Sequence, residues 1–200
     1  MIKNSIDSIF TTGYWTAAAA EVHKLRSLVF AGLTIALGTV LSSIYIPVGI
    51  NLRISFSFLV VAFGSMIFGP VVGLFTGLAY DLIGFVILPS NIFFPGYTLS
   101  TMLEFFIYGI FLYHSQISVL RIFVMKFLVN FIIHVGLGSL WSAILFGKGY
   151  YYFFVKSLIK NTIMLPIEVI MLVALLQVFL HILVREGFIP KQKGKYIPIV

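Results

Sequence analysis

The sequence predicts an all-α integral membrane protein, a bundle of six transmembrane helices with both termini on the cytoplasmic side. Three observations predict this fold. The 200 residues are 60% hydrophobic and only 10% charged, whereas about a quarter of the residues in soluble domains are charged. Apolar stretches of helical length recur along the chain, separated by short breaks. Lysine and arginine gather near the two ends, which is typical of cytoplasmic segments.

Residues 1–26 are predicted to form a cytoplasmic N-terminal arm. They mix charged side chains with the alanine run 17–20. No apolar core of about ten residues precedes a cleavage site, so we predict no cleavable signal peptide. The composition favours a poorly ordered arm with some helix in it.

The first three predicted spans are residues 27–46, 54–68 and 71–88. About 20 apolar residues are enough for a helix to cross roughly 30 Å of hydrocarbon. The second span is short, which is tolerated among other helices. Only Gly69 and Pro70 separate the second span from the third. The connection is too brief for anything but an antiparallel hairpin.

The remaining predicted spans are residues 98–113, 119–146 and about 152–184. Pro166 lies inside the last one. Residues 27–185 therefore form the membrane domain. Residues 186–200 form a basic cytoplasmic tail.

The distribution of cations also predicts an unusual outer surface. With both ends inside, Arg121 and Lys126 are counted among the cytoplasmic cations. Four cations then face outward, namely Arg53, Lys148, Lys156 and Lys160. Their segments, together with the aromatic loop 89–97, contain no Asp or Glu. A basic, aromatic surface without acids favours a planar, anionic solute.

Enzyme chemistry is not indicated. The chain has no cysteine, and its four histidines lack metal-ligand spacing. No metalloprotease, nucleophile-elbow or phosphate-loop motif is present. We therefore predict no catalytic residues, no metal, no cofactor and no nucleic-acid partner, leaving the lipid bilayer as the chain's surroundings.

Three acidic residues lie within predicted spans, namely Asp81, Glu104 and Glu168. Ionisable groups inside a membrane are functional candidates by default. They could carry protons in a secondary transporter that works alone. They could equally form hydrogen bonds to neighbouring helices, and the sequence leaves both interpretations open.

Small residues on the first span predict close helix packing. Ala31, Gly32 and Ala36 belong to this pattern, which lets another helix approach closely. The second helix could belong to a partner protein or to the chain's own bundle. The sequence alone favours the chain's own bundle.

Several stretches together carry a resemblance to a known family. They are LRISFSFLVVAFGSMIFGPVVGLFTGLAYDLIGFVILP, NIFFPGYTLS, IYGIFL, NFIIHVGLGSLWSAILFG and KSLIKNTIMLPIEVIML. The sequence resembles the S-component, the substrate-binding membrane subunit, of energy-coupling factor vitamin transporters, and specifically the folate family. The resemblance covers roughly residues 27–180. It implies a multi-pass protein of the bacterial cell membrane that captures folate with high affinity from outside.

The same resemblance implies protein partners. In this family, a transmembrane coupling protein and two ATP-binding cassette ATPases drive transport. S-components dock on the coupling protein through an AxxxA-type face, which matches Gly32 and Ala36 here, next to Ala31. This shifts the interpretation of the first span towards a partner interface. Glycine replaces the usual alanine at residue 32, and Glu104 stands where a small neutral residue is expected.

Folate combines a flat pterin, a benzoate and a glutamate tail with two carboxylates. The candidate stacking partners are Phe93, Phe94, Tyr97 and Trp141. The candidate groups that read the pterin edge are Asp81, Asn91 and Asn161. The candidate cations for the tail are Arg53, Lys156 and Lys160. An S-component for another vitamin, such as pantothenate or a pyridoxine-like compound, remains an alternative, as does the proton-coupled transporter.

Overall fold

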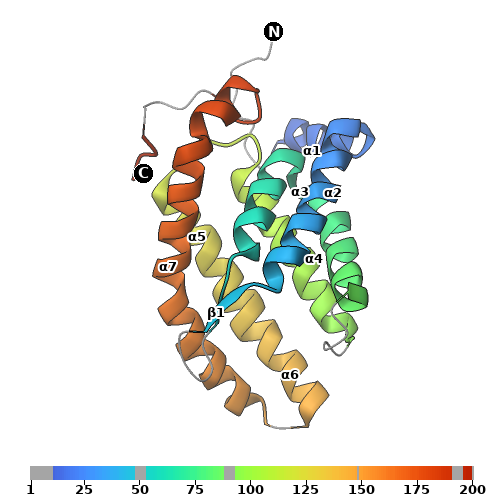
Figure 1. The fold of residues 1–200 in the computed structure, drawn as a ribbon, viewed down its shortest axis with the longest axis vertical. Helices are drawn as coiled ribbons and strands as arrows, with labels where there is room; N and C mark the ends of the chain where they lie inside the picture. The colour runs from blue at the N-terminus through green and yellow to red at the C-terminus, as the bar shows by residue number, and fades with distance from the viewer. Residues whose placement is uncertain (1–10, 48–52, 88–92, 148, 191–195, 200) are drawn as a thin grey trace.

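The computed structural model is a helical bundle, and it describes residues 11–47, 53–87, 93–147, 149–190 and 196–199. A nine-residue helix and a short 3-10 turn precede the bundle, namely α1 (Thr12–Ala20) and η1 (Glu21–His23). The bundle consists of α2 (Leu25–Ser42), α3 (Ser57–Ile87), α4 (Pro95–Leu112), α5 (Val119–Leu128), η2 (Val129–Leu137), α6 (Gly138–Phe146) and α7 (Tyr150–Arg185). In Figure 1, α1 and the end of α7 lie at one end of the bundle, and α6 lies at the other.

Four helical segments among the described residues are long and apolar enough to cross a membrane. They are Leu25–Ser42, Ser57–Ile87, Val119–Phe146 and Tyr150–Arg185. The third of these joins α5, η2 and α6 into one helical rod, as predicted for residues 119–146. Its middle part, η2, is π-helical. Such segments are uncommon and occur frequently at functional sites.

The segment named α3 is two helices joined at a sharp break. Gly69 has a φ of +76°, which favours glycine, and Pro70 begins the second half. A Cβ atom at Gly109 would lie 2.5 Å from Pro70 Cα, and one at Gly77 would lie 2.9 Å from Met102 Cα. These contacts show that the second half runs antiparallel to α4 at very close approach, which glycine permits.

A small strand pair lies between α2 and α3. The sequence predicts the end of the first span, a loop and the start of the second span in this region. β1 (Tyr45–Pro47) pairs antiparallel with β2 (Arg53–Ser55), and Ile46 lies opposite Ile54. α2 stops at Ser42, before the predicted boundary at residue 46, and the chain from Tyr45 to Pro47 is a strand instead. Ile54 accordingly belongs to a strand and not to the second span.

Residues 11–26 of the N-terminal arm pack on the bundle, whereas the composition of the arm favoured a poorly ordered segment; residues 1–10 lie outside the described residues. Tyr14 and Ala18 of α1 are buried against Tyr113. The Glu21 carboxylate accepts hydrogen bonds from Ser27 at 2.5 Å, Lys24 at 2.7 Å and Tyr113 at 2.9 Å. Burial alone would raise the pKa of Glu21, but these donors lower it below its ordinary value. Burial raises the pKa of Tyr14 to about 12.

The C-terminal segment also packs on the bundle. The backbone N–H groups of Val119 and Leu120, at the start of α5, donate to the carbonyls of Pro198 and Ile199, both at 2.9 Å. These are N–H groups that a helix cannot satisfy itself. The three lysines of the predicted basic tail, Lys191, Lys193 and Lys195, lie outside the described residues.

Candidate functional site

Two adjoining cavities form one chamber inside the bundle. Tyr97, Ser100, Glu104, Ile133 and His134 line both cavities, so we treat the cavities as two lobes of the chamber. The volumes are about 580 Å³ and about 910 Å³. Both lie within the range typical of small-molecule sites.

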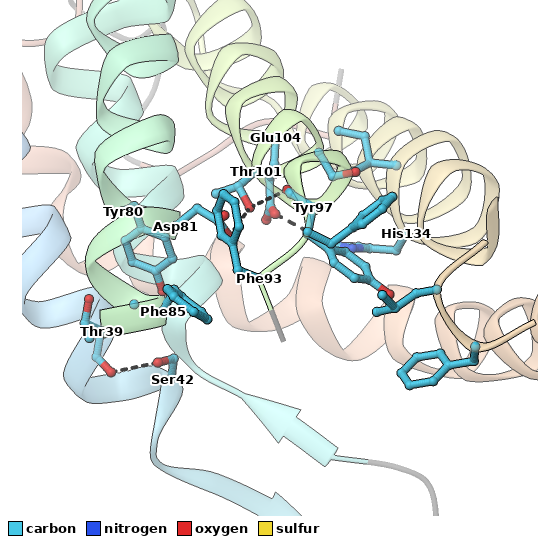
Figure 2. A pocket seen from close by; sticks show the side chains of 16 residues that line it. Thr39, Ser42, Tyr80, Asp81, Phe85, Phe93, Tyr97, Thr101, Glu104 and His134 are labelled. Atoms are coloured by element: carbon cyan, nitrogen blue, oxygen red, sulfur yellow. Dashed lines mark hydrogen bonds and ion pairs between the residues drawn. The ribbon is translucent and has the colours of Figure 1, made fainter. Parts of the chain in front are cut away.

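The smaller cavity, here the aromatic lobe, lies between α2, α3, α4, η2 and α6. Its aromatic lining consists of Tyr80, Phe85, Phe93, Phe94, Tyr97 and Phe146. Figure 2 shows Phe85, Phe93 and Tyr97 around the same space. The ring centroids of Phe85 and Phe93 are 5.3 Å apart, and those of Phe94 and Tyr97 are 5.9 Å apart. A lining of this kind suits a flat apolar or heteroaromatic group.

Trp141 supports the aromatic lobe from behind without lining it. Its Nε1 donates to Ser100 Oγ at 3.0 Å, and its ring centroid lies 5.8 Å from that of Phe94. A Cβ atom at Gly96 would lie 2.5 Å from both rings, so only glycine fits there. Trp141, which was predicted to stack on the ligand, thus contacts residues that line the chamber but does not line it itself.

Asp81 lines the aromatic lobe and also links two helices. Its Oδ2 accepts from Thr98 Oγ1 at 2.6 Å, and its Oδ1 lies 3.4 Å from Thr101 Oγ1. Both threonines belong to α4, while Asp81 belongs to α3. The two interpretations of this acid from sequence, pocket residue and helix-packing residue, therefore describe the same side chain.

The larger cavity, here the basic lobe, follows α7 from Phe153 to Glu168. At 1.5 Å per residue this stretch of helix is about 22 Å long. Lys156 and Lys160, one helical turn apart, line the lobe together with Asn161. Asn161 Nδ2 donates to the Ser157 carbonyl at 2.9 Å. Two neighbouring ammonium groups are suited to binding carboxylates.

A buried ion pair lies at the other end of the basic lobe. Lys126 Nζ is 3.0 Å from Glu168 Oε2, and the Lys126 side chain is only 1% exposed. Asn130 Nδ2 donates to the same Glu168 oxygen at 2.8 Å, and Lys126 donates to Tyr108 Oη at 3.1 Å. Lys126 had been counted among the cytoplasmic cations. The structure instead buries it, because Glu168 and Tyr108 satisfy its charge and donors.

Glu104 and His134 occupy the junction between the lobes. Glu104 Oε2 lies 4.0 Å from His134 Nε2, and Figure 2 shows the two side chains pointing towards each other. The sequence flagged Glu104 as an intramembrane acid, but it did not predict His134, Tyr80 or Lys126 as site residues. The only sequence feature that marks these three residues is a polar side chain within an apolar helix. No group of three His, Asp or Glu side chains suited to a metal ion occurs among the described residues.

Some predicted residues cannot be placed in the chamber. Arg53 belongs to β2, but its side chain lies outside what the structure describes, and Asn91 is likewise outside the described residues. Of the predicted docking residues, Ala31 is buried within the bundle. Gly32 and Ala36 are exposed on α2, and the position of a Cβ atom at Gly32 is open space.

Comparison with known proteins gives consistent matches. A sequence profile of the family described as ECF transporter, substrate-specific component, matches residues 26–189. The folate transporter FolT of Clostridium novyi (strain NT) is 33% identical over 154 residues, which is 76% of this chain and 88% of the relative. A crystal structure of FolT bound with folic acid matches with a TM-score of 0.67 at 31% identity, and the match covers 74% of this chain and 91% of that one.

Proposed function

Because this chain belongs to the family of ECF transporter substrate-specific components, and to the folate family within it, we propose that it captures folate outside the cell. It then delivers the vitamin inward when docked on a transmembrane coupling protein and two ATPases. The protein is a multi-pass bacterial membrane protein. The chemistry of the chamber is the observation that carries the proposal.

The two lobes match the two ends of folate. The aromatic lobe offers rings for stacking and acids that accept N–H groups from the pterin edge. The basic lobe places Lys156 and Lys160 where the two tail carboxylates can pair with them. We therefore assign the pterin to Phe93, Phe94, Tyr97 and Asp81, and the tail to the two lysines.

We further propose six membrane crossings with both termini inside. The two halves of α3 count as separate crossings, and α4 supplies one more. The start of α2, which holds Arg26, and the end of α7, which holds Arg185, lie at the same end of the bundle as α1, whereas the start of α7, which holds Lys156 and Lys160, lies towards the opposite end. The excess of cations near the termini supports a cytoplasmic location for that end.

The exposed face of α2 is our candidate for docking on the coupling protein. Gly32 and Ala36 are exposed there, flanked by the large exposed side chains of Leu33 and Leu37. Small residues between larger ones allow a second helix to approach closely. Ala31 packs inside the bundle, so we assign it a supporting role behind this face.

Folate binding can be tested by fluorescence. Replacing Trp15 with Phe leaves Trp141 as the single tryptophan, and Trp141 contacts both Ser100 and Phe94 at the chamber wall. Titration with folate should change its emission at nanomolar ligand. The matched control is Trp141→Phe, which should lose the signal while calorimetry still detects binding. Absence of binding by both methods would overturn the proposed function.

A transporter that works alone predicts a different result. Folate uptake by cells would then continue after loss of the partner ATPases. In the described structure Asp81 and Glu168 both have hydrogen-bonding partners on neighbouring helices. Dependence of uptake on ATP and on the co-purifying complex would support the S-component function.

A further inference from the structure

The aromatic lobe is lined by acidic side chains rather than by lysine or arginine in the part of the chain that the structure describes. Its charged or titratable lining groups, besides the Tyr80 and Tyr97 phenols, are Asp81, Glu104 and His134. No lysine or arginine lines it among the residues that the structure describes. A ligand head placed there meets carboxylate acceptors, so its own hydrogen-bond donors are favoured.

The two acids of the lobe are not equivalent. Asp81 accepts from Thr98 at 2.6 Å across the α3–α4 interface, which fixes its role in packing. Glu104 projects from α4 into the junction and lines both lobes. His134 Nε2 lies 4.0 Å from Glu104 Oε2, a separation that is too long for a direct hydrogen bond. Glu104 therefore has the more available carboxylate.

The nearby lysine is engaged elsewhere. Lys126 Nζ donates to the Tyr108 hydroxyl at 3.1 Å and pairs with Glu168 on α7 at 3.0 Å. The Lys126 charge is therefore matched by Glu168, and the Glu104 carboxylate keeps acceptor capacity for a ligand.

A second, independent observation points to a polar ligand in this lobe. Thr39 lines the lobe and is only 5% exposed, yet its hydroxyl has no hydrogen-bond partner in the described structure. Buried hydroxyls are normally satisfied. An N–H group or a ring nitrogen of a bound head could satisfy it.

We infer that Glu104 determines which pteridine heads the chamber prefers, favouring donor-rich 2,4-diaminopteridines over 4-oxo pterins. The inference rests on the proposed folate function and deepens it. Folic acid and its 4-amino analogue aminopterin share the benzoate and the glutamate tail. They differ at ring position 4: the 4-oxo ring has an acceptor oxygen there and an N3–H donor beside it, whereas the 4-amino ring has an amino group there and no proton on N3. The 4-amino ring is also more basic and takes up a proton on N1, beside its 2-amino group. A carboxylate pairs more strongly with this cationic edge than with the neutral N3–H edge.

The test compares both ligands on purified full-length protein by calorimetry at one pH. The wild type should bind aminopterin at least as tightly as folic acid. Glu104→Gln removes the charge at nearly constant size, and should weaken aminopterin by about tenfold more than folic acid. Glu186→Gln is the control, because Glu186 pairs with Arg185 near the end of α7, away from the chamber.

Each outcome decides the question. Equal losses for the two ligands in Glu104→Gln, no loss for either, or weaker aminopterin binding by the wild type would overturn the inference. If Glu104→Gln does not fold, Glu104→Asp keeps the charge but withdraws it by one methylene. It should still weaken aminopterin more than folic acid, and equal losses would again overturn the inference. Failure of the wild type to bind folic acid would instead overturn the proposed function.

Discussion

Breaking the buried ion pair between Lys126 and Glu168 should destabilise the bundle severely. At the observed 3.0 Å separation, Coulomb attraction amounts to about 5.5 kcal/mol at an effective dielectric constant of about 20. Desolvation offsets much of this gain. Removal of one partner, however, leaves the other charge buried, which typically costs about 3–5 kcal/mol. We expect a loss of this size for Lys126→Met, because Lys126 is only 1% exposed.

The assay is thermal unfolding of the purified protein in detergent, without ligand, for Lys126→Met, Glu168→Gln and the double variant. A loss of about 3–5 kcal/mol corresponds to a fall in Tm of roughly 6–20 °C for a chain of this size. The double variant should lose clearly less than the sum of the two single variants, since neither charge is left alone. Single losses below about 2 °C, or strict additivity, would refute the reasoning.

Three further predictions follow from other parts of the chain. Lys160→Ala should weaken folate by about tenfold while hardly affecting a pterin that lacks the benzoyl-glutamate tail, and equal losses in titrations would contradict a role in tail binding. The pKa of Glu21 is lowered from 4.5 in the folded chain, so its contribution to stability is present above about pH 4.5 and is lost as the pH falls through the lowered pKa. Tm measured against pH should therefore show that Glu21→Gln is destabilising at pH 7, by about 1–3 kcal/mol, and that the difference shrinks in acid; a difference independent of pH would count against it. Gly77→Leu should prevent folding because a Cβ atom would already lie 2.9 Å from Met102 Cα. Gly32→Leu, in open space, should fold and bind folate but no longer co-purify with the coupling protein. Normal co-purification of this variant would argue against docking through the exposed face of α2.

The arm and the chamber lie towards opposite ends of the bundle. Glu21 ties the arm to the start of α2 through Ser27 and to the end of α4 through Tyr113. Tyr113 also packs close to the α3 break at Gly69. The arm thus fastens three helices near the termini, while β1 and β2 and the loops around α6 lie near the opposite end.

The lysines illustrate how far the sequence could be interpreted. Lys156 and Lys160 were predicted as outward-facing cations and, from the resemblance to the folate family, as partners of the folate tail, and both line the basic lobe. Lys126 was counted as a cytoplasmic charge because its position along the chain was compatible with that side. Its burial depends on Glu168, which is 42 residues away in sequence. No local pattern indicates such a pairing.

The sequence by itself determined the membrane location, the long helical spans and the hairpin break at Gly69, whereas the candidate site residues came from the resemblance to the folate family. These features follow from composition, hydropathy and the conformational preferences of glycine and proline, which act locally. The tertiary structure decided which polar groups meet. It placed Glu104 and His134 at the junction of two lobes, paired Lys126 with Glu168, and packed the arm through Glu21. Such contacts join distant segments, and whether a charge is buried, paired or free depends on neighbours that only the packed bundle supplies.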